Sequence, residues 1–127
     1  MSSFPLYAAA ILTFAVGLVH SWLGERRLIG PLLAPDGLHG ILARSGFARN
    51  VLRFAWHLTT IAWWAMGAVF VVLAASPIDG TARAVLGILA TAMLVTGLLT
   101  LVVSRGRHLA WPVFLAIAGL AARSALV

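Results

Sequence analysis

The stretch FAWHLTTIAWWAMGAVFVVLA, residues 54–74, decides the fold, because it is a long apolar run interrupted by a single ionisable side chain, His57. A helix needs about 20 consecutive apolar residues to cross the hydrocarbon core of a bilayer. With the residues on either side, the stretch forms a segment from about Val51 to Ala75 that meets this length. Because backbone polar groups find no partners in lipid, we expect this segment to be an α-helix.

Three further segments have the same apolar character: about Phe4 to Leu23, Thr81 to Val103 and Leu109 to Val127. A continuation of the first segment to Ile29 stays open. The turn SPIDG (76–80) and the link SRGRH (104–108) join the last three segments, and links this short make consecutive helices antiparallel neighbours. The sequence therefore predicts an all-α integral membrane protein. We expect one domain over residues 1–127, a four-helix transmembrane bundle with up-down topology.

Composition supports a lipid environment for most of the chain. Of its 127 residues 62% are hydrophobic and 9% charged, with a mean hydropathy of +1.05. An average soluble domain is roughly a quarter charged, and a soluble fold of this size leaves too much surface exposed to hide so many apolar side chains. There is no cysteine, which excludes disulfides and thiolate metal sites. The first segment lacks the positive start of a signal peptide, so we expect it to be retained.

The distribution of arginine predicts the orientation. All nine basic residues are arginine. Seven fall on one side of the expected topology, namely Arg26, Arg27, Arg44, Arg49, Arg53, Arg105 and Arg107, whereas Arg83 and Arg123 lie toward the other. The positive-inside rule places the seven in the cytoplasm and both termini outside, as expected for a multi-pass protein of the bacterial inner membrane. The same rule accounts for a pI near 11.9 without a nucleic-acid partner.

The one long connection, the expected cytoplasmic loop 25–50, has a pattern of its own. Pro31 and Pro35 are expected to break the helix after the first span, and Asp36 is a candidate N-cap. Beyond it, Leu38, Ile41, Leu42 and Phe47 recur at helical spacing. This pattern predicts a short amphipathic helix lying in the membrane interface between the first two spans.

The four histidines, His20, His39, His57 and His108, all fall in the expected cytoplasmic half of the bundle. Ionisable groups within spans usually face the bundle interior, and neutral imidazole is a common metal ligand. We therefore predict a site that holds Fe, Cu, Zn or a haem. Its predicted metal ligands are His20, His57, His108 and Glu25, and its predicted cofactor-contacting side chains are Arg53, Trp64 and Trp111.

Helical spacing specifies some of the expected contacts. Arg53, His57, Thr60 and Trp64 share one helix face. Arg53 lies one turn before His57, where it is placed to hold an anion or a carboxylate such as Glu25. Glu25 lies about 140° around an ideal helix from His20. The two side chains meet only if the helix unwinds near Gly24 or another helix brings the partner.

A purely structural interpretation remains open beside the metal site. In this interpretation His57 pairs with Ser21 or Thr60, and His20 donates a hydrogen bond to a neighbouring helix. His39 and His108 contact water at the membrane boundary. Trp22, Trp56 and Trp111 lie where tryptophans form an aromatic belt at the membrane interface.

The sequence leaves three functional classes open and does not decide whether the protein is an enzyme. The first is a redox or metal-handling membrane protein that uses the histidine cluster. The second is a small oligomeric transporter or channel, and the third a structural accessory subunit of a larger membrane complex. Small residues such as Ala90, Gly97 and Ala118 favour close helix packing, within the bundle or in a homo-oligomer.

Overall fold

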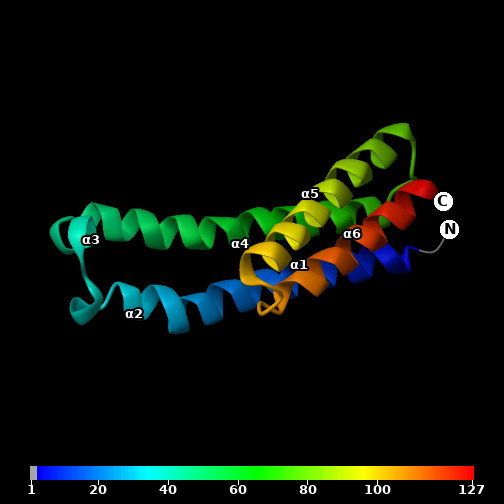
Figure 1. Ribbon diagram of the computed structural model, residues 1–127. Coiled ribbons are helices and arrows are strands. Elements are labelled where there is room, and N and C mark those ends of the chain that lie inside the picture. The colour runs from blue at the N-terminus through cyan, green and yellow to red at the C-terminus, as the bar shows by residue number, and fades with distance from the viewer. Residues whose placement is uncertain (1–2) are drawn as a thin grey trace. The chain divides into compact units, whose positions relative to one another are not determined.

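The computed structural model describes residues 3–127, and over this range it is helical with no β-strand (Figure 1). The elements are α1 (Phe4–Gly24), the π-helix η1 (Glu25–Ile29), α2 (Gly30–Leu32), the 3₁₀ helix η2 (Pro35–Gly37), α3 (Gly40–Arg44), α4 (Gly46–Ala74), α5 (Gly80–Ser104) and α6 (Ala110–Leu126). The prediction of an all-α chain is confirmed.

Three helices are long and apolar enough to cross a membrane. They are the continuous helix Phe4–Leu32 and the helices α4 and α5, with 29, 29 and 25 residues. The fourth predicted span corresponds to α6, an apolar helix of 17 residues and therefore shorter. The membrane character of the chain is thus supported, whereas the fourth crossing and the up-down order remain predictions.

The chain divides into two compact units, which are described separately. One comprises the residues up to Val16 together with Trp64–Val127, and the other comprises Gly17–Trp63. The helices α1 and α4 each run through both units.

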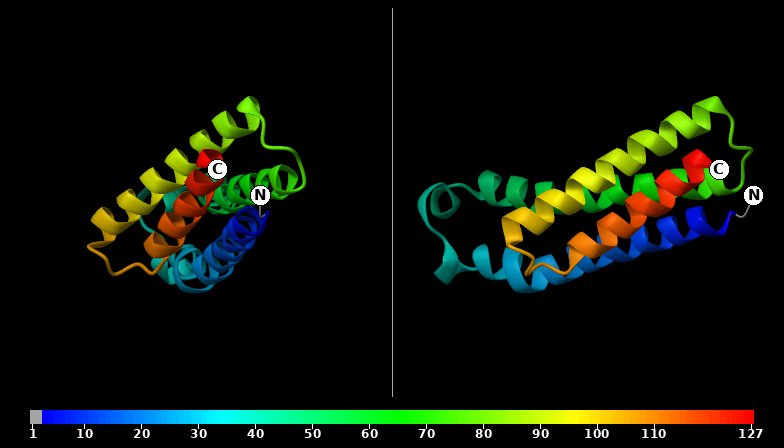
Figure 2. Two further views of the ribbon diagram at one scale, coloured as in Figure 1. Left: turned by 90° about the vertical axis from the view of Figure 1, so that its right-hand side faces the viewer. Right: turned by 45° about the vertical axis from the view of Figure 1, so that its right-hand side comes forward.

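In the first unit α5 and α6 pack side by side (Figure 2). Leu86, Met93, Phe114 and Ile117 are buried there. A Cβ added to Gly97 would lie 2.8 Å from a methyl carbon of Leu115, so the absence of a side chain lets the two helices approach closely. The helix α5 begins where the Asp79 carboxylate accepts a hydrogen bond from the Ala82 amide at 2.7 Å.

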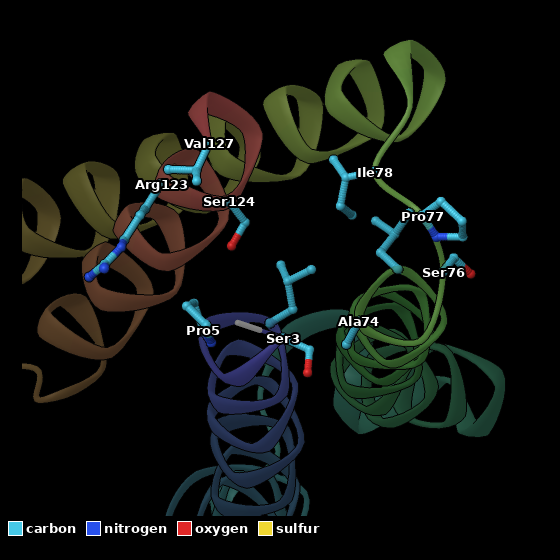
Figure 3. A pocket seen from close by; sticks show the side chains of 11 residues that line it. Ser3, Pro5, Ala74, Ser76, Pro77, Ile78, Arg123, Ser124 and Val127 are labelled. Atoms are coloured by element: carbon cyan, nitrogen blue, oxygen red, sulfur yellow. The ribbon is translucent and has the colours of Figure 1, made fainter. Parts of the chain in front are cut away.

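The first unit also contains a cavity of about 310 Å³ (Figure 3). It lies among the beginning of α1, the turn after α4 and the end of α6. Its walls are mostly apolar, with Leu6, Leu73 and Ile78 among them. Of the residues from Ser3 onward that line it, Arg123 alone has an ionisable side chain. Ser124 is buried at its edge and donates to the Leu120 carbonyl at 3.0 Å.

In the second unit the first helix continues past Leu23, as the sequence left open. It runs through a π-turn, Glu25–Ile29, and ends at Leu32, one residue beyond Pro31, where a break was expected. The Gly30 amide donates to the Glu25 carbonyl, the wider i to i+5 bond that defines such a turn. A Cβ on Gly30 would lie 2.7 Å from that carbonyl oxygen, so this turn requires glycine.

The loop 25–50 also differs in detail from the prediction. Its helix α3 has only five residues and begins after His39, so the prediction of Asp36 as N-cap is wrong; Asp36 lies in η2. The helix α4 begins at Gly46 rather than near Val51, because the Ser45 hydroxyl accepts the Ala48 amide at 3.2 Å and starts the helix earlier. Phe47, predicted on the stripe of the loop helix, belongs to α4.

Candidate functional site

Five polar side chains of the second unit form a connected group between α1 with its π-turn and α4. We call this group the polar cluster; its members are Ser21, Glu25, Arg53, His57 and Thr60. The cluster residues of α1 and its π-turn contact those of α4 in reverse order along the chain, as expected for two antiparallel helices. Residues three, four and seven apart share a helix face, which is why Arg53, His57 and Thr60 all point to α1.

Glu25 is bound by two cationic or protonatable partners from α4. One carboxylate oxygen lies 3.1 Å from an Arg53 guanidinium nitrogen, and the other lies 3.2 Å from His57 Nε2. The three side chains are between about a third and a half exposed in the isolated chain. Pairing of this kind lowers the cost of a carboxylate in a helix that is long and apolar enough to cross a membrane. The predicted contact between Arg53 and Glu25 is confirmed.

The second ring nitrogen of His57 extends the cluster toward the middle of the helices. His57 Nδ1 lies 2.8 Å from the Ser21 hydroxyl, which lies 2.8 Å from the hydroxyl of Thr60. Thr60 is buried and lies within 3.3 Å of the Gly17 carbonyl. A chain of hydrogen bonds therefore runs from Arg53 through Glu25, His57 and Ser21 to Thr60, and the Thr60 hydroxyl also lies within reach of the α1 backbone at Gly17. The pairing of His57 with Ser21 that the sequence left open is confirmed.

The positions of the donors and acceptors assign the direction of these hydrogen bonds. An ionised carboxylate only accepts, so neutral His57 carries its proton on Nε2 and donates it to Glu25. Nδ1 is then an acceptor, and the Ser21 hydroxyl donates to it. The Ser21 oxygen in turn accepts from Thr60, whose single hydroxyl proton is then not available to the Gly17 carbonyl.

His20 lies beside the polar cluster in an aromatic setting. Its ring stacks on Trp56, with centroids 4.3 Å apart and planes 9° from parallel, and Trp63 meets it edge-on at 4.9 Å. Its Nε2 lies 3.1 Å from the Thr59 hydroxyl. The Trp56 indole donates to the His20 carbonyl at 3.2 Å and lies directly against Gly24, where any side chain would overlap it.

The remaining predicted site residues belong to the first unit. The Trp64 indole donates to the Phe14 carbonyl at 3.1 Å, and the Trp111 indole to the Gly106 carbonyl at 3.3 Å. His108 is exposed, and its Nδ1 accepts the Ala110 amide at 3.2 Å. Over residues 3–127, no group of three or more His, Asp or Glu side chains is arranged to hold a metal ion. The metal or haem site stays a prediction.

Sequence reasoning did not find three features of this site. The π-turn after Gly24, the contact of Trp56 with Gly24 and the stacking of His20 on Trp56 were all absent from the expected contacts. The one available signal was the pair of glycines, Gly24 and Gly30, on either side of the only glutamate. The position of Trp56 in the sequence predicts a place in the aromatic belt, whereas its side chain is half-buried and contacts α1.

Comparisons with known proteins give no match to any family model, curated protein or solved structure.

Proposed function

We propose that this chain is a small proton-translocating protein of the bacterial inner membrane, in the class of small transporters and channels. In this proposal the Glu25–His57 pair receives a proton from the cytoplasmic side, and Ser21 and Thr60 lead it into the span. The observation that carries the proposal is the direct contact of the Glu25 carboxylate with His57 Nε2 at 3.2 Å, within a helix pair apolar enough to cross a membrane.

Three properties of the polar cluster support this function. Carboxylates and imidazoles within spans are typical of proton relays in pumps and transporters. Imidazole and hydroxyl side chains, here His57, Ser21 and Thr60, can both donate and accept a hydrogen bond, as a relay requires. Arg53 balances the charge of Glu25 without being able to lose its own proton. The proposed orientation, with the arginine-rich ends of the helices in the cytoplasm, places Glu25 nearer the aqueous side than Thr60.

The test is proton flux into liposomes that contain the purified protein and a trapped pH-sensitive dye, driven by a potassium diffusion potential. Wild-type protein is expected to acidify the lumen faster than protein-free liposomes do. Glu25→Gln and His57→Gln each keep a similar side-chain size but remove one half of the proton-binding pair. We expect each to lower the protein-dependent rate by about tenfold or more, as for loss of an essential proton-transfer group.

Two matched variants control for the loss of an acid or a histidine as such. Asp36→Asn removes a carboxylate from η2, and His39→Gln removes an imidazole from the N-cap of α3, and both are expected to retain the wild-type rate. Wild-type protein without flux above the protein-free rate, or unchanged flux in Glu25→Gln and His57→Gln, would contradict the proposal.

The metal or haem function predicted from the histidines is tested on the same purified protein. Both ring nitrogens of His57 already have hydrogen-bonding partners, so coordination there would have to displace Ser21 or Glu25. Elemental analysis measures the metal content of the protein, and an optical spectrum measures its haem content. One equivalent of a transition metal or haem that is lost in His57→Gln would favour the metal function over proton translocation.

A further inference from the structure

The end of the second unit that carries the polar cluster also carries three arginines outside it: Arg26 and Arg27 on the π-turn, and Arg49 on α4. The ion pairs recorded for residues 3–127 are those of Glu25 with Arg53 and His57, so these arginines have no carboxylate partner within that range. Arg26 and Arg27 follow Glu25 directly, and Arg49 precedes Arg53 by one turn. The contact between Glu25 and Arg53 therefore brings the three arginines to the same end of the helix pair.

Two of these arginines are held by other contacts. The Arg26 guanidinium lies over the Trp22 ring, 5.2 Å from its centroid, which leaves the N–H groups at its edge available. One Arg49 nitrogen donates to the Leu42 carbonyl at 2.7 Å, which ties α4 to α3 and leaves the other N–H donors of its guanidinium. Guanidinium groups present paired donors that match phosphate oxygens, so this arginine triad is suited to an anion with several oxygens.

We infer that Arg26, Arg27 and Arg49 form a binding site for the phosphate of an anionic phospholipid. The inference goes beyond proton translocation and does not depend on it. The triad lies at the ends of two helices long and apolar enough to cross a membrane, at the level where lipid phosphates are expected. Basic groups at such a level attract anionic lipids by roughly 1 kcal/mol each, about fivefold in affinity.

Apolar side chains beside the triad favour a lipid over an acidic peptide or a nucleic acid. Trp22, Leu28 and Phe54 are 57%, 49% and 62% exposed. Leu28 and Phe54 lie on elements that also carry an arginine at this end of the helix pair, and the Trp22 ring lies beneath the Arg26 guanidinium. A phospholipid supplies both a phosphate for the arginines and an acyl chain for these apolar groups. A peptide or nucleic acid would leave the apolar groups exposed.

The test is native mass spectrometry of the detergent-purified protein with equal amounts of phosphatidylglycerol and phosphatidylcholine. Wild-type protein is expected to retain phosphatidylglycerol preferentially. The triple variant Arg26→Gln, Arg27→Gln, Arg49→Gln should lower that retention by about tenfold or more. The matched control, Arg105→Gln, Arg107→Gln, Arg123→Gln, removes the same charge elsewhere and should retain the lipid as wild type does. Circular dichroism checks that both variants remain helical.

Four results would overturn the inference. Equal retention of the two lipids by wild-type protein would exclude selectivity for the anionic headgroup. Full retention by the triple variant, or the same loss in the matched control, would exclude the arginine triad as the site. Displacement of phosphatidylglycerol by an equal concentration of soluble glycerol phosphate would show that the site binds phosphate in general rather than a lipid. Lipid retention is measured without proton flux, so failure of either proposal leaves the other testable.

Discussion

Glu25 is the only glutamate of the chain, and its position depends on the glycines on either side of it. Gly24 leaves room for the Trp56 indole, which lies between the two helices and stacks on His20. Gly30 lets the Glu25 carbonyl take the wide hydrogen bond of the π-turn. π-turns of this kind are frequent at functional sites, because one extra residue per turn redirects the side chains around it. Here the turn begins at the residue that contacts both Arg53 and His57.

At the residue scale, Gly30→Ala is expected to destabilise the protein by about 1–3 kcal/mol, the usual range for a substitution that strains the backbone. The physical reason is the 2.7 Å approach of the added Cβ to the Glu25 carbonyl oxygen. Thermal unfolding in detergent, followed by circular dichroism, measures the change.

The matched control is Gly87→Ala in the interior of α5. A Cβ there has no neighbour within 4 Å, so the better helix propensity of alanine is expected to stabilise by about 0.5–1 kcal/mol. If Gly30→Ala unfolds at the same temperature as Gly87→Ala, the π-turn does not require glycine and this account of Glu25 is wrong.

At the scale of elements, polar contacts rather than a large apolar core hold α1 to α4 in the second unit. In lipid the hydrophobic effect gives helices little reason to associate, so small residues and hydrogen bonds between helices carry the specificity. Ser21 and Thr60 illustrate this, since their hydroxyls meet 2.8 Å apart and Thr60 also reaches the backbone of α1 at Gly17. The same two residues thus fix the helix pair and complete the chain of hydrogen bonds.

Because the chain has no cysteine, this pairing is open to a direct cross-linking test. Ser21→Cys combined with Thr60→Cys places two sulfurs where oxygens now lie 2.8 Å apart, close to the reach of a disulfide. Under mild oxidation we expect an intramolecular disulfide, detected as the loss of two hydrogens in the intact mass of the monomer. The control pair, Ser21→Cys with Leu58→Cys, uses an exposed position of α4 and should remain reduced. Equal oxidation of the two pairs would mean that α1 and α4 do not keep this register.

The existence and type of the long helices follow from hydropathy, but their ends do not. The predicted span Thr81–Val103 agrees within one residue with α5, because Asp79 caps the helix and an SRG turn ends it. The predicted start of α4 is five residues late, because the hydropathy of the chain records where the apolar run begins, whereas Ser45 starts the helix earlier among polar residues. For the same reason the π-turn over Glu25 and the arginines was assigned to the loop.

At the scale of the whole molecule, the proposed direction of proton movement depends on which side of the membrane the arginines face. A cysteine-free chain allows single cysteines to report this with a membrane-impermeant maleimide on intact cells. Ser76→Cys, in the turn after α4, is expected to be labelled from outside, and Asp36→Cys, in η2, only after the cells are opened. The opposite pattern would reverse the proposed orientation, although the contacts of the polar cluster would be unaffected.

Helical spacing predicted the site only within one helix: it places Arg53, His57 and Thr60 on one face of α4. The partners named for that face, Glu25 and Ser21, are present on the neighbouring helix. The convergence of His57 with His108, Trp64 and Trp111 needs the rotation and placement of separate helices, which helical spacing does not determine. Those residues lie in the other compact unit, and their convergence remains a prediction.

The contact between Glu25 and His57 is the claim on which the proposed function rests, and solid-state NMR in lipid measures it directly. Because Glu25 is the only glutamate, a ¹³C label on the glutamate side-chain carboxyl reports on it alone. With ¹⁵N-labelled histidine rings, a carboxylate oxygen 3.2 Å from His57 Nε2 predicts strong dipolar dephasing of the Glu25 signal. We expect that dephasing to be lost in His57→Gln and kept in His39→Gln. A Glu25 signal that shows no dephasing, or keeps it in His57→Gln, would contradict the account.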